Sequence, residues 1–315
     1  MEEINYKDSF TRTVISWLLY PPGVLLPLAC IVAISTPDNP QRLLPLALIG
    51  LITSCLAEFI QPHMKKRQSS HNDIITDIAH ATLSLGLATL LRVILIYVFF
   101  LAVSSTSESF ALVTWPSNWP LGLQVILGLA VAELGTYWRH RLFHEWNIAW
   151  RFHSVHHSSK RLYFLNATRF HFIDLCLAGL ASAIPLALCG ASAEIVVLVS
   201  IFTGLHGNWQ HANARYRLGW LNWVYSAAEL HRWHHSSIIS QSNSNYGNNL
   251  IIWDTIFGTR YLPTEPQNVE QFGLGTHGEV YPQTWRKQLL VPFLWERLFK
   301  QLPDQQAAQN EQQHE

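Results

Sequence analysis

Half of the 16 histidines in this 315-residue chain lie in three short clusters. Within each cluster the residues are three or four positions apart, a spacing that places imidazoles on one face of a helix. Neutral imidazole binds iron, zinc, copper and nickel, and a tetrahedral zinc ion takes only four ligands. Eight convergent imidazoles therefore predict two metal ions with coordination positions to spare. The predicted ligands are His140 and His144, then His153, His156 and His157, and then His231, His234 and His235.

Other residues near these clusters are candidates for the same site. His211 is expected to be a further ligand because it lies closer to the third cluster than His206 does. The sequence leaves three roles open for His206, which are a metal ligand, a support for a ligand and a structural residue. Glu133 lies two helical turns before His140, where it either accepts the second ring N–H of a ligating histidine or faces a neighbouring helix. His171 is expected to support the site rather than bind metal.

The elements that must position these residues are apolar helices. Only 13% of the residues are charged, against about 25% in soluble proteins. Six nearly uncharged runs stand out, and a run of about 20 residues can span a bilayer. We therefore expect an all-α integral membrane bundle, with about four spanning helices, a short hairpin that turns around Gly190, and a cytoplasmic helical cap that holds the histidines. The runs cover residues 14–35, 43–60, 78–103, 119–138, 172–189 and 193–205.

Basic residues gather on one side when these runs are paired as hairpins. That side holds the 61–77 loop, the 139–171 segment and everything after residue 206, whereas Arg42 is the only basic residue in the loops of the other side. Basic loops stay in the cytoplasm. The sequence thus predicts a multi-pass protein with all three clusters at the cytoplasmic face. The acidic, polar start of the chain does not resemble a signal peptide, so we expect the first run to remain as an anchor.

Several classes of protein are disfavoured. The chain has 21 basic and 21 acidic residues without a basic stripe, which argues against a nucleic-acid partner. His144-Glu145 begins like a zinc peptidase motif, but Ile148 occupies the place of the second histidine. Metal transport favours ligands at the middle of the bilayer on broken helices. A zinc-dependent membrane hydrolase and a non-catalytic metal-binding or lipid-binding membrane protein remain the alternatives to an oxidoreductase.

From about Glu133 to Thr259 the chain resembles the fatty acid hydroxylase superfamily, also called the sterol desaturase family. The likeness rests on the three clusters in order, on the segment that ends at His211, and on two motifs that follow the third cluster. These motifs are Asn245-Tyr246-Gly247 and Trp253-Asp254-Thr255-Ile256-Phe257-Gly258-Thr259.

The resemblance implies a non-haem di-metal centre, taken to be two iron ions, that uses O₂ to hydroxylate or desaturate a sterol, fatty acyl chain or related lipid. It also implies an external electron carrier, such as a ferredoxin or a cytochrome b5-like protein, since no flavin or haem motif is evident. By resemblance and position, Asn245 and Asp254 support the ligands. We expect membrane helices in 1–125, a catalytic domain in 126–262, a cap extension in 263–302 and a disordered tail in 303–315.

Overall fold

The computed structural model describes residues 43–64, 70–103, 112–216, 218–263, 269, 271–300 and 302. Within these residues every regular element is a helix, and isolated β-bridges join only loops. The all-α prediction is therefore confirmed for the described part of the chain. The apolar run predicted over 14–35, Arg42 and the predicted disordered tail lie outside the described residues.

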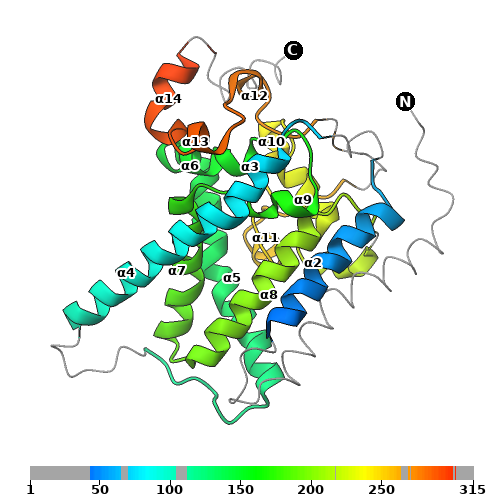
Figure 1. Cartoon of the computed structure of the whole chain (residues 1–315). Coiled ribbons are helices and arrows are strands. Elements are labelled where there is room, and N and C mark those ends of the chain that lie inside the picture. The colour runs from blue at the N-terminus through cyan, green and yellow to red at the C-terminus, as the bar shows by residue number, and fades with distance from the viewer. Residues whose placement is uncertain are drawn as a thin grey trace.

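Long helices form the body of the molecule. In Figure 1, α2, α5, α7 and α8 run beside one another, whereas α4 leaves the bundle at an angle. A π-helical turn, η3, joins α3 to α4 without a break. Their bounds are α2 Leu43–Ile60, α3 Ile74–Ala79, η3 His80–Ser84, α4 Leu85–Val103, α5 Leu121–Glu145, α7 Phe172–Leu188 and α8 Ala193–His211.

These bounds agree with the apolar runs to within four residues, except at the carboxyl ends of α5 and α8. The predicted run 119–138 is the start of α5, which continues to Glu145 and so carries His140 and His144. Likewise α8 continues six residues beyond the predicted run 193–205, to His211. Gly190, at φ +72°, forms the turn between α7 and α8 and confirms the predicted hairpin. Apolar composition marks where a helix lies in the bundle, but the helix continues for as long as its backbone hydrogen bonds do.

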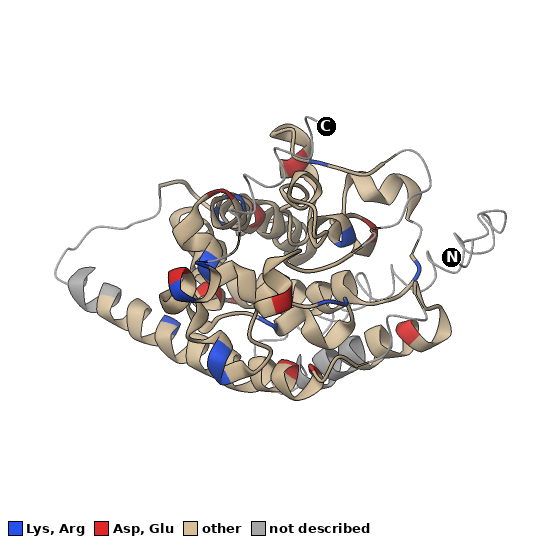
Figure 2. Ribbon diagram, turned by 90° about the horizontal axis from the view of Figure 1, so that it is seen from above, with Lys and Arg blue, Asp and Glu red and all other residues tan. Residues whose placement is uncertain are grey.

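Two segments of the described chain, Ile74–Val98 and Leu121–Glu145, are long and apolar enough to cross a membrane, and α7 is a shorter apolar helix. Residues 93–98 of α4 are uncharged, as the tan part of this helix in Figure 2 shows, and their side chains are exposed, as at Ile94 and Ile96. An exposed apolar face of this kind is typical of a helix in contact with lipid.

Close helix contacts hold the bundle together. Val125 and Leu129 of α5 pack against Val199 and Phe202 of α8 in the main hydrophobic core. A methyl group added at Gly128 of α5 would lie 2.9 Å from the Ile195 side chain, so only glycine lets the two helices approach this closely.

The short helices gather at one end of the bundle. In Figure 1, α6, α10, α12, α13 and α14 lie at that end, and α14 packs against α6. Because α5 and α8 both reach toward this end, their terminal histidines meet those of the short helices. The bounds are α6 Asn147–His157, η4 Phe164–Thr168, η5 Gly219–Trp223, α9 Ala228–His234, α10 Ile239–Ser242, α11 Ile252–Ile256, α12 His277–Val280, α13 Trp285–Gln288 and α14 Val291–Phe299.

Candidate metal centre

The nine histidines expected to be ligands come together in two groups. In each group the potential ligand atoms lie within 4.8 Å of one another, and every member is buried. His206 and His171 belong to neither group. The first histidine group comprises His140, His144, His153, His157 and His234, and the second histidine group comprises His156, His211, His231 and His235.

Each H-x-x-H-H cluster divides between the two groups. On α6, the i, i+4 pair His153 and His157 joins the first histidine group, and His156 joins the second. The third cluster is used the other way round, because His231 and His235 join the second group and His234 the first. The side chains of residues i and i+4 point to nearly the same side of a helix, whereas the side chain of the residue between them points further away. The second and third clusters therefore each contribute to both groups, whereas His140 and His144 both lie in the first group.

Oxygen acceptors fix the orientation of several of these rings. In the first histidine group, the Nδ1 atom of His140 lies 2.7 Å from the Tyr246 carbonyl oxygen, and that of His153 lies 2.9 Å from Asp174 Oδ2. The Nδ1 atom of His234 lies 2.8 Å from the Ser244 carbonyl oxygen. A carbonyl or carboxylate oxygen can only accept, so Nδ1 carries the proton and Nε2 keeps its lone pair.

The second histidine group is oriented in the same way by a different segment. His156 Nδ1 donates to the Arg169 carbonyl oxygen at 3.2 Å, and His211 Nδ1 donates to Asn166 Oδ1 at 2.8 Å. An amide oxygen also orients one ring of the first group, since His144 Nδ1 lies 3.2 Å from Asn243 Oδ1. Both groups thus present Nε2 lone pairs to their interiors.

These inward nitrogen atoms need a cation. The Nε2 atoms of His144, His157 and His234 are buried and have no hydrogen-bond partner. Burial also lowers the pKa of His153, His156, His157, His231 and His235 well below its usual value, and that of His234 to about 4. The rings are therefore neutral near pH 7 and cannot satisfy one another by protonation. A metal ion would satisfy these lone pairs, so the residues fit a metal in each group.

The spacing of the nitrogen atoms bears on the geometry. The Nε2 atoms of His140 and His153 are 2.9 Å apart, as are those of His211 and His231, and those of His231 and His235 are 3.0 Å apart. With metal–nitrogen bonds of about 2.1 Å, ligands at right angles are about 3.0 Å apart and tetrahedral ligands about 3.4 Å apart. The observed distances are short enough for neighbouring imidazoles to share one metal ion.

Asp254 and Asn245 hold the loop that carries Tyr246. The carboxylate of Asp254 accepts hydrogen bonds from the backbone N–H groups of Tyr246 and Gly247, each at 2.8 Å, and so holds the carbonyl group that orients His140. Burial raises the pKa of Asp254 to about 6. Asn245, at φ +52°, donates to the Leu230 carbonyl oxygen at 3.0 Å and ties this loop to α9.

Glu133 supports the same loop by a route that the sequence did not indicate. Its carboxylate accepts hydrogen bonds from the backbone N–H groups of Asn248 and Asn249, and from the Asn249 side chain at 2.8 Å. Of the two alternatives for Glu133, the hydrogen bond to a histidine ring is not the one observed, because the carboxylate bonds to the loop that holds Tyr246. The backbone N–H groups of this loop lie close to α5, and the buried carboxylate of Glu133 accepts hydrogen bonds from two of them.

His206 and His171 have structural partners. His206 donates from Nδ1 to the Asn248 carbonyl oxygen at 3.1 Å and stacks on Phe202, so its position favours the structural alternative. His171 caps α7, because its Nδ1 accepts from the Ile173 backbone N–H at 3.2 Å, and its Nε2 donates to the Leu289 carbonyl oxygen.

Sequence reasoning missed three supporting residues, namely Asp174, Asn166 and Asn243. Asp174 did carry a signal, because a carboxylate at the start of an apolar run is costly unless it has a partner. It pairs with both His153 and Arg139. Asn166 lies in the short helix η4 and Asn243 directly after α10, and nothing in their local sequence distinguishes them.

A cavity of about 350 Å³ leads to the first histidine group. His144 and His157 line it, whereas no member of the second group does. Trp150 and Trp295 form aromatic walls, and α14 contributes much of the outer side. Only the first histidine group is therefore accessible from this cavity.

Comparison with known proteins identifies the family. The fatty acid hydroxylase family model matches residues 125–259. The chain is 38% identical over 241 residues to an ornithine lipid hydroxylase of Rhizobium tropici, a match covering 76% of this chain and 71% of the relative. This chain belongs to the fatty acid hydroxylase family. Family members are named hydroxylases and monooxygenases, and the chain is accordingly an oxidoreductase.

More distant members of the fatty acid hydroxylase family match shorter regions. The chain is 36% identical over 145 residues to an alkylglycerol monooxygenase of Xenopus tropicalis, which covers 46% of this chain and 31% of that protein. It is 26% identical over 167 residues to methylsterol monooxygenase 2-2 of Arabidopsis thaliana, covering 51% of this chain and 61% of the relative. No solved structure matches the chain.

Proposed function

We propose that the protein is a membrane-bound non-haem di-iron oxygenase that hydroxylates or desaturates a lipid at a C–H bond. The observation that carries this proposal is the pair of buried all-histidine groups whose Nε2 atoms face inward. The first histidine group would hold one iron ion and the second histidine group the other. Bound iron would supply the activation of O₂, for which imidazole ligands and free coordination positions are suitable.

The first histidine group offers five imidazoles, one more than a tetrahedral zinc ion takes, which supports iron over the zinc of the alternative hydrolase. Electrons would come from a separate carrier, either a ferredoxin or a cytochrome b5-like protein. Residues 126–262 would form the catalytic domain, residues 1–125 its membrane helices and residues 263–302 the extension that closes the cap.

The protein's own residues would exclude water and orient the substrate. Burial of all nine histidines keeps solvent from the metals. The cavity that reaches His144 and His157 combines aromatic walls with Glu145 and Lys300, so it suits the part of a lipid where the polar head meets the chain. We therefore favour a polar-headed acyl lipid, of which the ornithine lipid in the name of the Rhizobium relative is an example.

The placement of the site suggests how a lipid reaches it. The histidines of α5 lie at the carboxyl end of a helix long enough to cross a membrane. The basic residues of the 61–77 and 139–171 segments favour the cytoplasmic side for that end. In a multi-pass protein of this kind, lipid would enter from the bilayer and the electron carrier would approach from the cytoplasm.

Metal analysis and turnover of the purified full-length protein test the proposal. We expect two iron ions per chain, O₂ consumption with reductant and lipid, and a product heavier by one oxygen or lighter by two hydrogens in mass spectrometry. His234→Ala should lose metal and turnover together, whereas the exposed His71 provides a matched control, His71→Ala, that keeps both. A single zinc ion with activity retained in His234→Ala would refute the proposal.

A further inference from the structure

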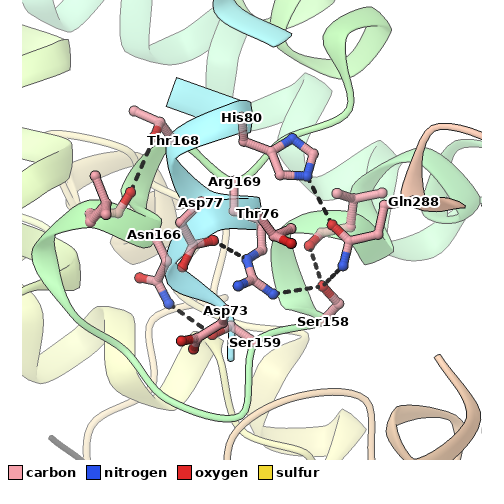
Figure 3. A network of polar contacts seen from close by, with 12 residues as sticks. Asp73, Thr76, Asp77, His80, Ser158, Ser159, Asn166, Thr168, Arg169 and Gln288 are labelled. Atoms are coloured by element: carbon pink, nitrogen blue, oxygen red, sulfur yellow. Dashed lines mark hydrogen bonds and ion pairs between the residues drawn. The ribbon is translucent and has the colours of Figure 1, made fainter. Parts of the chain in front are cut away.

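Two buried aspartates near the start of the α3–α4 helix lie outside both histidine groups and outside the region matched by the family model. Asp73 is 3% exposed and Asp77 is fully buried. Each pairs with one arginine. Arg161 donates to both oxygens of Asp73, at 2.8 and 2.7 Å. Arg169 donates from Nε to Asp77 Oδ1 at 2.5 Å, a contact drawn in Figure 3.

The segment between these two arginines carries the acceptors for the second histidine group. The carbonyl oxygen of Arg169 accepts from His156 Nδ1, and Asn166 Oδ1 accepts from His211 Nδ1. The Phe170 ring, next in the chain, stacks on His156 at 3.9 Å with 14° between the planes. Two of the four rings in this group thus depend on residues 161–170.

The amide of Asn166 is held in one orientation. Its Nδ2 donates to the Arg161 carbonyl oxygen at 2.6 Å and to Ser159 Oγ at 2.9 Å, the second of which is visible in Figure 3. The oxygen must then face His211, which fixes the proton on Nδ1 and leaves Nε2 for metal. Tyr163 adds a further link, since its hydroxyl donates to Asp77.

The acceptors of four rings of the first histidine group lie elsewhere. They are the carbonyl oxygens of Tyr246 and Ser244, the side chain of Asn243, and Asp174 at the start of α7. A change in the contacts of α3 with residues 161–169 should therefore alter metal affinity at the second histidine group and leave the affinity of the first group unchanged.

We propose that Asp73 and Asp77 are positioning residues for the second metal ion. Through Arg161 and Arg169 they hold the segment that orients His156 and His211, and so they couple the base of a candidate membrane helix to that ion. This inference rests on the proposed di-metal function. Loss of the support behind a ligating imidazole lowers metal affinity by about 10- to 100-fold, which is the expected effect for the second ion.

Metal titration of the full-length protein in detergent, against a competing chelator, tests this role. In the His157→Ala background only the second histidine group is intact, and there Asp77→Asn should weaken iron binding by about 10- to 100-fold. In the His235→Ala background only the first group is intact, and Asp77→Asn should leave its affinity unchanged. Glu296→Gln is the matched control, because Glu296 pairs with Arg151 on the histidine-bearing α6 but is 80% exposed.

Asp77→Asn leaves Arg169 as a buried charge without its partner, which can prevent folding. The double variant Asp77→Asn/Arg169→Gln removes both charges and should show the same selective loss. Unchanged affinity at the second histidine group in a folded variant, or equal loss at both groups, overturns the proposal. A wild-type protein with one metal ion would instead overturn the di-metal function itself, so the two failures are distinguishable.

Discussion

Substitution of Asp174 should weaken metal binding at the first histidine group and leave metal binding at the second histidine group unchanged. Asp174 Oδ2 accepts from His153 Nδ1 at 2.9 Å, both side chains are fully buried, and the other carboxylate oxygen pairs with Arg139. In Asp174→Asn, one side of the group becomes an NH₂ donor, which must face either the imidazole N–H or the guanidinium. The charge-assisted hydrogen bond to His153 is lost in either orientation.

The magnitude follows from the two contacts. Loss of the carboxylate behind a ligating histidine should lower metal affinity by about 10- to 100-fold, which corresponds to about 1.4 to 2.8 kcal/mol. Removing one partner of a buried ion pair costs a further 3 to 5 kcal/mol of folding free energy, roughly, because Arg139 is left buried. The first effect appears in metal binding and the second in the stability of the metal-free protein.

The assay separates these effects. Iron affinity is measured by chelator competition in the His235→Ala background, where only the first histidine group is intact, and stability is measured by thermal unfolding of the metal-free protein. Asp174→Asn/Arg139→Gln removes both charges, and it should recover much of the stability but not the affinity. If Asp174→Asn binds the first ion as tightly as the parent protein, the role assigned to this carboxylate is wrong.

Three further predictions concern the histidines. His206→Ala should keep two metal ions per chain but lower stability by about 1 to 3 kcal/mol, because the Asn248 carbonyl oxygen loses its donor; a loss of metal would restore the ligand alternative. The pKa of His234 is about 4 in the folded protein and about 6.5 when unfolded, so the unfolded chain binds the extra proton between these values. Stability of the metal-free protein should therefore be complete above about pH 6.5 and fall toward pH 4, with a shallower slope in His234→Gln; equal slopes in the two proteins would contradict this. Removal of iron by a chelator should lower the melting temperature, since the Nε2 atoms of His144, His157 and His234 would lose their only partner. An unchanged melting temperature would argue against bound metal in the first histidine group.

The sequence was sufficient for features that depend on local spacing. An apolar run marks a helix through its own composition, and the bounds of α2 and the start of α7 agree with those runs. The histidine clusters could be found for the same reason, since residues three and four positions apart on a helix are neighbours wherever that helix packs. All nine expected ligands accordingly lie in the two groups.

Only the tertiary structure decided how those ligands are divided and what holds them. The assignment of His156 to one group and His157 to the other depends on which rings of α8 and α9 reach α6, since His156 lies against His211 of α8 and His157 against His234 of α9. Likewise the partners of His153 and His211, Asp174 and Asn166, are distant from them in the chain and carry no spacing pattern. Hydrogen bonds between remote segments form only once the helices have packed, because packing fixes which buried donor meets which acceptor. The sequence by itself therefore determined which histidines could bind metal, whereas the packing of the helices determined which of them come together in each group.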